Sequence, residues 1–204
     1  MNLKPLSFAA IALAAFVVAA QQKPIDTKDW KSFATKDGKF SIKAPKSWGP
    51  ANPDDDATKA ELAKIKANNP QLAKIFEKRD SNFDLYLLDY DDAAKGVTNL
   101  NVLSIKESGL TTEMYPEMAS ELFKQASLKD TGYKVIDQPV GKMLTYWGVL
   151  GIRLGDGKTM NFKANGYVCI KDDVTYICTM TSAVDGDKVQ KPIFDAMAKT
   201  IVLK

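Results

Sequence analysis

Two cysteines, Cys169 and Cys178, are the residues of this sequence whose type and spacing most directly suggest chemistry. They lie on the two arms of a hairpin expected over residues 167–180, where opposed residues of an antiparallel pair share a constant index sum. A four-residue loop sets the cysteines face to face, whereas a three-residue loop separates them. In an oxidising compartment the first register permits a disulfide. The alternative is two buried thiols that act as small hydrophobic side chains.

Histidine is absent from all 204 residues of the chain. It is the usual general base and the commonest metal ligand, so Ser-His-Asp and Cys-His catalysis within the chain are excluded and ordinary catalytic zinc is not expected. The sequence also lacks a Gly-x-Ser-x-Gly, Walker-type or dinucleotide-binding glycine motif. Carboxylate chemistry stays open, but spacing marks no pair of acids. We therefore expect no enzymatic activity and no cofactor.

Aspartates gather at residues 54–56 and again at Asp89, Asp91 and Asp92, where their oxygens could bind calcium. Neither stretch continues into the spaced carboxylates and terminal glutamate of an EF-hand loop. Acidic side chains are favourable at the start of a helix, which explains the first group. The second group is interpreted as a solvated loop. No metal site is expected.

Tyr146 and Trp147 are the candidates for a binding surface, because they lie next to each other in one long expected strand. Successive side chains of a strand point to opposite faces of the sheet, so at least one of the two can belong to the core. Tyrosine and tryptophan are frequent at the energetic centres of interfaces. The pattern leaves open which of them, if either, binds a partner.

Residues 1–20 have the three parts of a secretory signal peptide: Lys4, an apolar run over 6–20, and small residues that predict cleavage after Ala20. The run is shorter than the roughly 20 apolar residues of a membrane span, and an uncleaved anchor is the alternative. We expect export, and the signal does not separate periplasm, lumen and extracellular space. Residues 21–29 are expected to be a flexible polar leader.

The remaining chain, residues 30–204, has the length of a single domain. Its composition, 45% hydrophobic and 26% charged for the full sequence, is typical of a globular protein. The formal net charge of the full chain is +3, and the lysines are scattered among aspartates. No clustered basic surface is predicted, so nucleic acid is not an expected partner.

Hydrophobic periodicity and turn residues predict the secondary structure of this domain. Strands are expected over 30–35, 40–44, 83–90, 99–105, 133–140, 143–154, 158–171 and 174–182, and helices over 57–66, from residue 70, over 112–127 and over 188–200. On the last helix Val189, Ile193, Phe194 and Met197 are predicted to form the buried side. The short connections favour antiparallel pairing. The fold class is therefore α+β, with helices packed on an antiparallel sheet.

The stretch containing Phe40, Ile42, Pro45 and Trp48 resembles the entry motif Phe-x-Ile/Val-x-x-Pro-x-x-Trp of PsbP-like domains, a superfamily that includes Mog-type proteins and exported bacterial relatives. A helix pair broken at residues 69–70, an Asn-x-Asn-Val strand at 99–102, the hairpin over 167–181 and a final helix follow in the same order. Together they cover most of residues 30–204.

The resemblance implies an α/β/α sandwich around a central antiparallel sheet and a non-enzymatic role. Relatives act as accessory or adaptor subunits of larger assemblies, including photosystem II and a Ran-binding import factor. No position of this sequence transfers a manganese, calcium or Ran site from them, so the particular partner does not carry over.

The sequence thus favours an exported, non-catalytic accessory or binding protein that acts through a protein partner at the membrane or envelope, within a membrane-associated complex. The alternative is a carrier of a small ligand or lipid, with an apolar ligand held between sheet and helices. A carboxylate-dependent hydrolase is the third reading.

Overall fold

The computed structural model describes residues 24–50, 59, 60, 63, 67, 83–91, 98–106, 109–153 and 157–204. The expected signal peptide with its cleavage site after Ala20 lies outside the described residues. So do the start of the leader, the aspartates at 54–56 and most of the helix pair broken at residues 69–70, of which only residues 59, 60, 63 and 67 are described, as helical. Those expectations stay predictions.

A small sheet contains β1 (Lys31–Ala34), β2 (Phe40–Ala44) and β10 (Val202–Leu203) in the order β1-β2-β10. The hairpin predicted between β1 and β2 is confirmed. In its loop the Asp37 carboxylate accepts hydrogen bonds from the Thr35 hydroxyl at 2.7 Å and from the Lys39 N–H at 3.0 Å. Gly38 takes a positive φ of 67°, which glycine adopts without steric cost.

The large sheet has seven antiparallel strands in the order β3-β4-β5-β9-β8-β7-β6. They are β3 (Trp48–Pro50), β4 (Leu85–Asp89), β5 (Asn99–Lys106), β6 (Lys129–Gln138), β7 (Gly141–Arg153), β8 (Thr159–Lys171) and β9 (Val174–Ala183).

Two short strands, β3 and β10, were not predicted from the sequence. The prediction treats Gly49 and Pro50 as breakers, but both pair with β4. Proline is tolerated there because β3 is an edge strand of the sheet.

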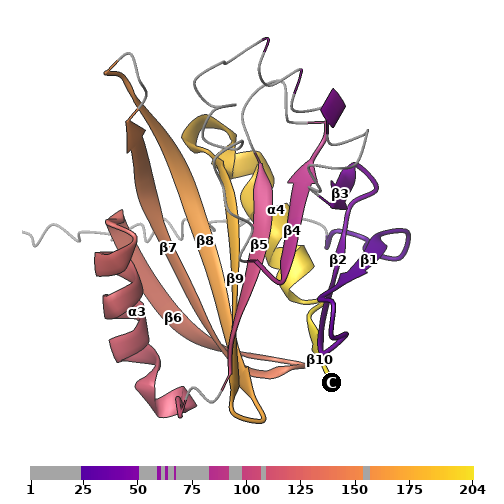
Figure 1. Ribbon diagram of the computed structural model, residues 1–204, viewed down its shortest axis with the longest axis vertical. Helices are drawn as coiled ribbons and strands as arrows, with labels where there is room; N and C mark the ends of the chain where they lie inside the picture. Colours follow the sequence, from indigo (N-terminus) through magenta and orange to yellow (C-terminus); the bar gives the residue numbers. More distant parts are fainter. Residues whose placement is uncertain are drawn as a thin grey trace, which may run out of the picture.

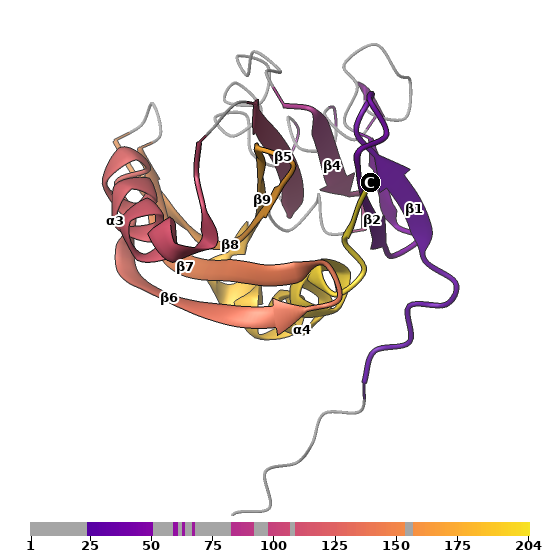
Figure 2. The ribbon, with the colours of Figure 1, turned by 90° about the horizontal axis from the view of Figure 1, so that it is seen from below.

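Two helices of the described chain lie on opposite faces of the large sheet, α3 (Tyr115–Gln125) on one and α4 (Asp187–Ala198) on the other (Figures 1 and 2). Short 3-10 turns, η1 (Thr112–Met114) and η2 (Val184–Gly186), lead into them. The predicted α+β class and the α/β/α layering are confirmed. The small sheet covers the same face as α4, because β2 shares its apolar cluster.

The larger apolar cluster lies between α4, the small sheet and the large sheet. At its centre the rings of Trp48 and Phe194 meet edge to face, with centroids 6.3 Å apart. The buried stripe of α4 corrects one expectation: Val189 is 69% exposed and Gln190 is buried instead. The stripe continues through Phe194 and Met197, so it follows the i, i+4, i+7 spacing from residue 190, and residue 189 lies beside it.

A second cluster lies between α3 and the other face of the sheet. Tyr115 and Ala119 of α3 pack there on Leu144 and Val168. The two faces of the sheet are thereby both covered in this region, and alternate residues of β7 and β8 belong to different cores.

Candidate functional site

The cysteines lie side by side on one face of the sheet, but they do not face each other. β8 and β9 are joined by a two-residue turn, Asp172 and Asp173, both with positive φ (49° and 59°), so that Lys171 pairs with Val174. This corrects the expected four- or three-residue loop; aspartate tolerates the left-handed region that such a turn requires.

In the observed register Cys169 pairs with Tyr176 and Cys178 with Tyr167. The cysteines are therefore diagonal neighbours, whose Cα atoms are roughly 7–8 Å apart in such a pair. That is longer than disulfide geometry accepts. Both thiols are free and buried, and the predicted facing pair is not formed. Burial raises the pKa of Cys169 to about 12 and raises the pKa of Cys178 as well.

We expect neither thiol of the folded protein to react with iodoacetamide at pH 8, because the reactive thiolate is suppressed and shielded. In 6 M guanidinium without reductant both thiols should be alkylated, which intact mass measures directly. Fewer than two labels on the unfolded chain would reveal a disulfide and contradict the observed register.

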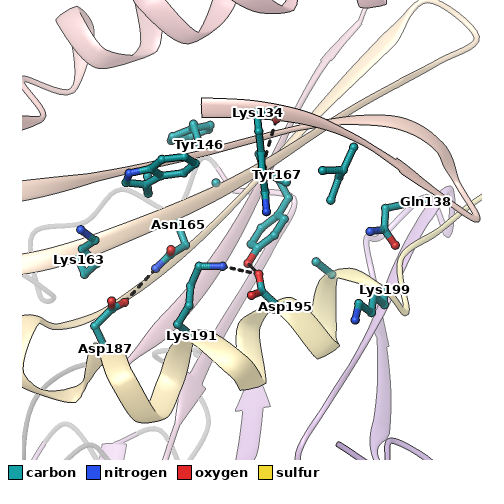
Figure 3. Close-up of a pocket in the computed structure, with 15 residues that line it drawn as sticks. Lys134, Gln138, Tyr146, Lys163, Asn165, Tyr167, Asp187, Lys191, Asp195 and Lys199 are labelled. Carbon is teal, nitrogen blue, oxygen red and sulfur yellow. Dashed lines mark hydrogen bonds and ion pairs between the residues drawn. The ribbon is translucent and has the colours of Figure 1, made fainter. Parts of the chain in front are cut away.

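An open groove lies between α4 and strands β6–β8, and we call it the α4 groove (Figure 3). Its volume is about 540 Å³, within the usual range of ligand sites of about 300–1,000 Å³. Ile136, Trp147 and Ala198 supply apolar surface, and the other lining side chains are largely polar.

The charge of the α4 groove comes from three elements that are distant in sequence. β6 contributes Lys134, β8 contributes Lys163, and α4 with its C-cap contributes Asp187, Lys191, Asp195 and Lys199. With four lysines and two aspartates, the lining has a net charge of +2. Lys191 forms an ion pair with Asp195. Among the described residues, no carboxylate lies at ion-pair distance from the other three lysines.

A polar network connects the sheet to α4 at the floor of the groove (Figure 3). The Tyr167 hydroxyl donates to Asp195 Oδ1 at 2.9 Å, and Asn165 Nδ2 donates to Asp187 Oδ1 at 3.4 Å. Burial, and after it the charge of Asp195, raises the pKa of Tyr167, so the hydroxyl stays protonated as a donor. These bonds hold the two aspartates in place against the sheet.

Asn165 is only 2% exposed, and its side-chain oxygen, buried at the groove, has no hydrogen-bond partner among the described residues. A buried acceptor without a donor costs roughly 1–3 kcal/mol. Its amide nitrogen donates to Asp187, so Asn165 joins the sheet to α4 while its oxygen stays unsatisfied in this structure.

Trp147 is half-buried and lines the α4 groove. It is paired with Gly132 on β6, and a Cβ at position 132 would lie 2.3 Å from the indole Cζ2. The absence of a side chain on Gly132 therefore lets the indole lie flat across β6. Of the two aromatic candidates predicted from the sequence, Trp147 is the one with an accessible ring.

Tyr146, the other candidate, is also among the residues that line the groove. Its side chain, however, packs in the cluster on the α3 side of the sheet, and the residue is only 6% exposed. Its hydroxyl shares a 3.1 Å hydrogen bond with the Thr179 hydroxyl, and its ring meets Phe123 at 6.1 Å. The predicted placement of the two side chains on opposite faces is thus observed.

The groove contains two carboxylates, so we compared their arrangement with that required by a carboxylate-dependent hydrolase. Asp187 and Asp195 are eight residues apart on α4, which places them about 12 Å apart along the helix axis. Paired carboxylates of glycosidases are roughly 5–9.5 Å apart. Both groups are also engaged, by Asn165 and by Tyr167 with Lys191. The arrangement does not support hydrolysis, and we do not propose it.

The described residues contain no group of three or more His, Cys, Asp or Glu side chains that could hold a metal ion. Asp89, one of the aspartates considered above, is nearly buried and its Oδ1 accepts from the Asp91 N–H at 3.3 Å. Asp92 lies outside the described residues. Among the described helices, none has the length and apolar character needed to cross a membrane.

The lysines of the groove were not predicted as a group. In the sequence they are separated by up to 65 positions, and only the sheet order brings β6 and β8 next to the same helix. A partial signal exists: Lys191 and Lys199 are eight residues apart, which places them on one side of a helix. The strand pairing needed to add Lys134 and Lys163 is not encoded locally.

The α/β/α arrangement is shared with solved structures whose sequences differ widely from this chain. The Ran-binding protein Mog1p of Saccharomyces cerevisiae is similar over 86% of this chain and 95% of its own, with a TM-score of 0.51 and 8% identity. The predicted resemblance to Mog-type and PsbP-like proteins is thereby confirmed as a likeness of fold.

Two further solved structures are similar at lower scores. The cyanobacterial PsbP protein (CyanoP) of Synechocystis covers 89% of this chain and 96% of its own at 10% identity, with a TM-score of 0.48. LpqN of Mycobacterium tuberculosis, described as involved in cell envelope biogenesis, covers 89% and 90% at 6% identity, with a TM-score of 0.47. No protein-family model and no curated protein matches the sequence.

Proposed function

We propose that this protein is an exported, non-catalytic accessory protein that binds a protein partner through the α4 groove. The observation that carries the proposal is that one open groove combines an accessible tryptophan with three lysines that have no acidic partner among the described residues. Aromatic anchors and complementary charge are the features that give protein interfaces their affinity and specificity.

Export is supported by the signal pattern over residues 1–20, and it is compatible with a partner at the membrane or envelope. The mature chain would begin at Gln21 and contain the single domain over 30–204. The similarity in fold to a Ran-binding protein agrees with a binding role but names no partner. The two acids of the groove are held by neighbours at a separation unsuited to hydrolysis, so the proposal is binding and not hydrolysis.

The groove is tested by reversing one of its charges. Lys163→Glu removes an attraction for an acidic partner surface and adds a repulsion, so capture of the partner from the host envelope should weaken at least about tenfold. Lys124→Glu is the matched control, because Lys124 is exposed on α3, on the opposite face of the sheet. Equal loss in both variants, or loss in neither, would refute the groove as the binding site.

A small-ligand carrier is the second candidate, and the volume of the α4 groove favours it. The cationic lining fits an anionic ligand better than a neutral lipid. Native mass spectrometry of the protein isolated from its host separates the two candidates. A mass above that of the polypeptide supports the carrier, and a bare mass together with a crosslinked partner supports the accessory role.

A further inference from the structure

β6 is the last strand of the large sheet, and in the described part of the chain it pairs with β7 alone (Figure 2). The pairing is irregular between Lys129 and Gly132 and regular from Gly132 to Gln138. Those seven residues contain no proline and no further irregularity. An edge of this length with unpaired N–H and C=O groups is a template for another strand.

The backbone groups at this free edge can be assigned from the register. Lys134 pairs with Thr145, and the Thr145 hydroxyl donates to the Lys134 carbonyl at 3.2 Å, so the Lys134 backbone faces β7. In an antiparallel strand the inward and outward backbone groups alternate from residue to residue. The N–H and C=O groups of Tyr133, Val135 and Asp137 therefore face outward.

The two faces of β6 differ in chemistry at the same edge. On the α3 side Tyr133 and Val135 are 44% and 45% exposed. On the opposite side Lys134 points into the α4 groove, toward Tyr167 (Figure 3). An added strand would thus meet apolar side chains on one face and cationic groove on the other.

We propose that β6 is the docking edge for an extended segment of the protein partner, in which acidic residues alternate with apolar ones. The apolar side chains would cover Tyr133 and Val135, and the acidic ones would enter the α4 groove beside Lys134. This inference rests on the proposed function and specifies how the partner binds. Strand addition to an exposed edge derives affinity from main-chain bonds and specificity from alternate side chains.

Charge argues against a second copy of this chain as the occupant. Two β6 strands paired edge to edge would bring together two grooves, each with a net charge of +2. A lysine on an edge strand is a common device against such self-pairing. The same lysine attracts an acidic segment, so the edge discriminates between the two occupants.

The first test uses a synthetic peptide of seven residues in which Glu and Val alternate, and the same peptide with Lys in place of Glu. On adding the Glu peptide to the isotope-labelled protein, amide exchange of Tyr133, Val135 and Asp137 should slow at least about tenfold, as expected when each N–H gains a partner. The Lys peptide should give no protection. Equal protection by both peptides, or by neither, overturns the inference, as does protection that rises with protein concentration in the absence of peptide.

The second test uses the variant Val135→Pro, which deletes an outward N–H without removing a β6–β7 bond, and Val135→Thr as its control. The proline variant should bind the Glu peptide about tenfold more weakly, and the threonine variant within about twofold of the unmodified protein. If Val135→Pro does not fold, the amide exchange of the unmodified protein with the two peptides still tests whether β6 is the docking edge. If partner capture survives Val135→Pro but is lost in Lys163→Glu, the proposal that the α4 groove binds the partner stands and the proposal that β6 is the docking edge is refuted. If neither variant affects capture, both proposals are refuted.

Discussion

Gly166→Ala is expected to lower the free energy of unfolding by about 3 kcal/mol, because overpacking a close-packed core costs roughly 1–3 kcal/mol and occasionally more. A Cβ at position 166 would lie 1.9 Å from Cζ of the Tyr146 ring. The ring cannot move away without losing its contact with Phe123 and its hydrogen bond to Thr179. Thermal melting should record a decrease in Tm of about 6–12 °C for a protein of this size.

The control and the coupling identify the cause of this loss. Gly186→Ala adds a Cβ with no atom within 4 Å. The free energy of unfolding should therefore change by about 0.5 kcal/mol or less, and Tm should stay within a degree or two of that of the unmodified protein. In a Tyr146→Ala background the obstacle is gone, and Gly166→Ala should then have little further effect. An equal loss with and without the Tyr146 ring would show that the predicted clash is not the reason.

Alkaline unfolding is the second large effect. Burial raises the pKa of Tyr115 and Cys169 to about 12 and raises the pKa values of Tyr146, Tyr167 and Cys178. In the unfolded chain cysteine titrates near 8.5 and tyrosine near 10. The unfolded state therefore loses protons first as the pH rises, so the free energy of unfolding falls with increasing pH.

The size of the effect follows from the number of groups. Each contributes about 1.4 kcal/mol per pH unit between its unfolded and folded pKa values. The two cysteines should give a slope of about 3 kcal/mol per unit between pH 9 and 10, and the tyrosines steepen it above pH 10. The free energy of unfolding should be constant between pH 6 and 8. For a typical free energy of unfolding of about 5–15 kcal/mol, it should fall to zero near pH 11.

Urea denaturation at half-unit intervals from pH 7 to 11 measures this profile. The variant Cys169→Ala/Cys178→Ala should lose most of the slope between pH 9 and 10 and keep the decline above pH 10. A flat profile to pH 11 would contradict the burial of these groups. An unchanged slope in the double variant would assign it to other residues.

The fold was predictable where local patterns decide it. Asp37 and Gly38 fix the β1–β2 hairpin, and alternation along β7 and β8 fixes both strands, because a half-buried strand requires a period of two. The length of the turn at Asp172 and Asp173 could not be predicted in the same way. Consecutive aspartates fit loops of several lengths, and one residue more or less moves the partner of Cys169.

The candidate site was predictable only in part. The alternation of Tyr146 and Trp147 indicates opposite faces, but which face is open depends on where α3 and α4 dock. The exposure of Val189 shows the same limit, since a helical stripe can be read one residue out of phase when a polar residue such as Gln190 is buried. The groove lysines become neighbours through strand order, which no local pattern encodes.

The proposed groove and β6 edge give a role to an accessible tryptophan and to three lysines that have no acidic partner among the described residues. The side chains that hold the floor, Tyr167 and Asn165, bond to α4, so the groove is built on two elements fixed by the core. Preformed sites of this kind bind with little ordering cost. Under the proposed function, a partner would meet this rigid surface on the α4 side of the sheet.

Site-specific photocrosslinking in the native host tests this central claim most directly. A benzophenone amino acid replaces Gln138 at the α4 groove in one variant, which leaves the groove lysines in place, and Lys124 on α3 in the other. We expect one discrete crosslinked protein from position 138 and none from position 124. Crosslinks from position 124 alone, or the same products from both positions, would contradict the assignment of the α4 groove as the partner-binding site.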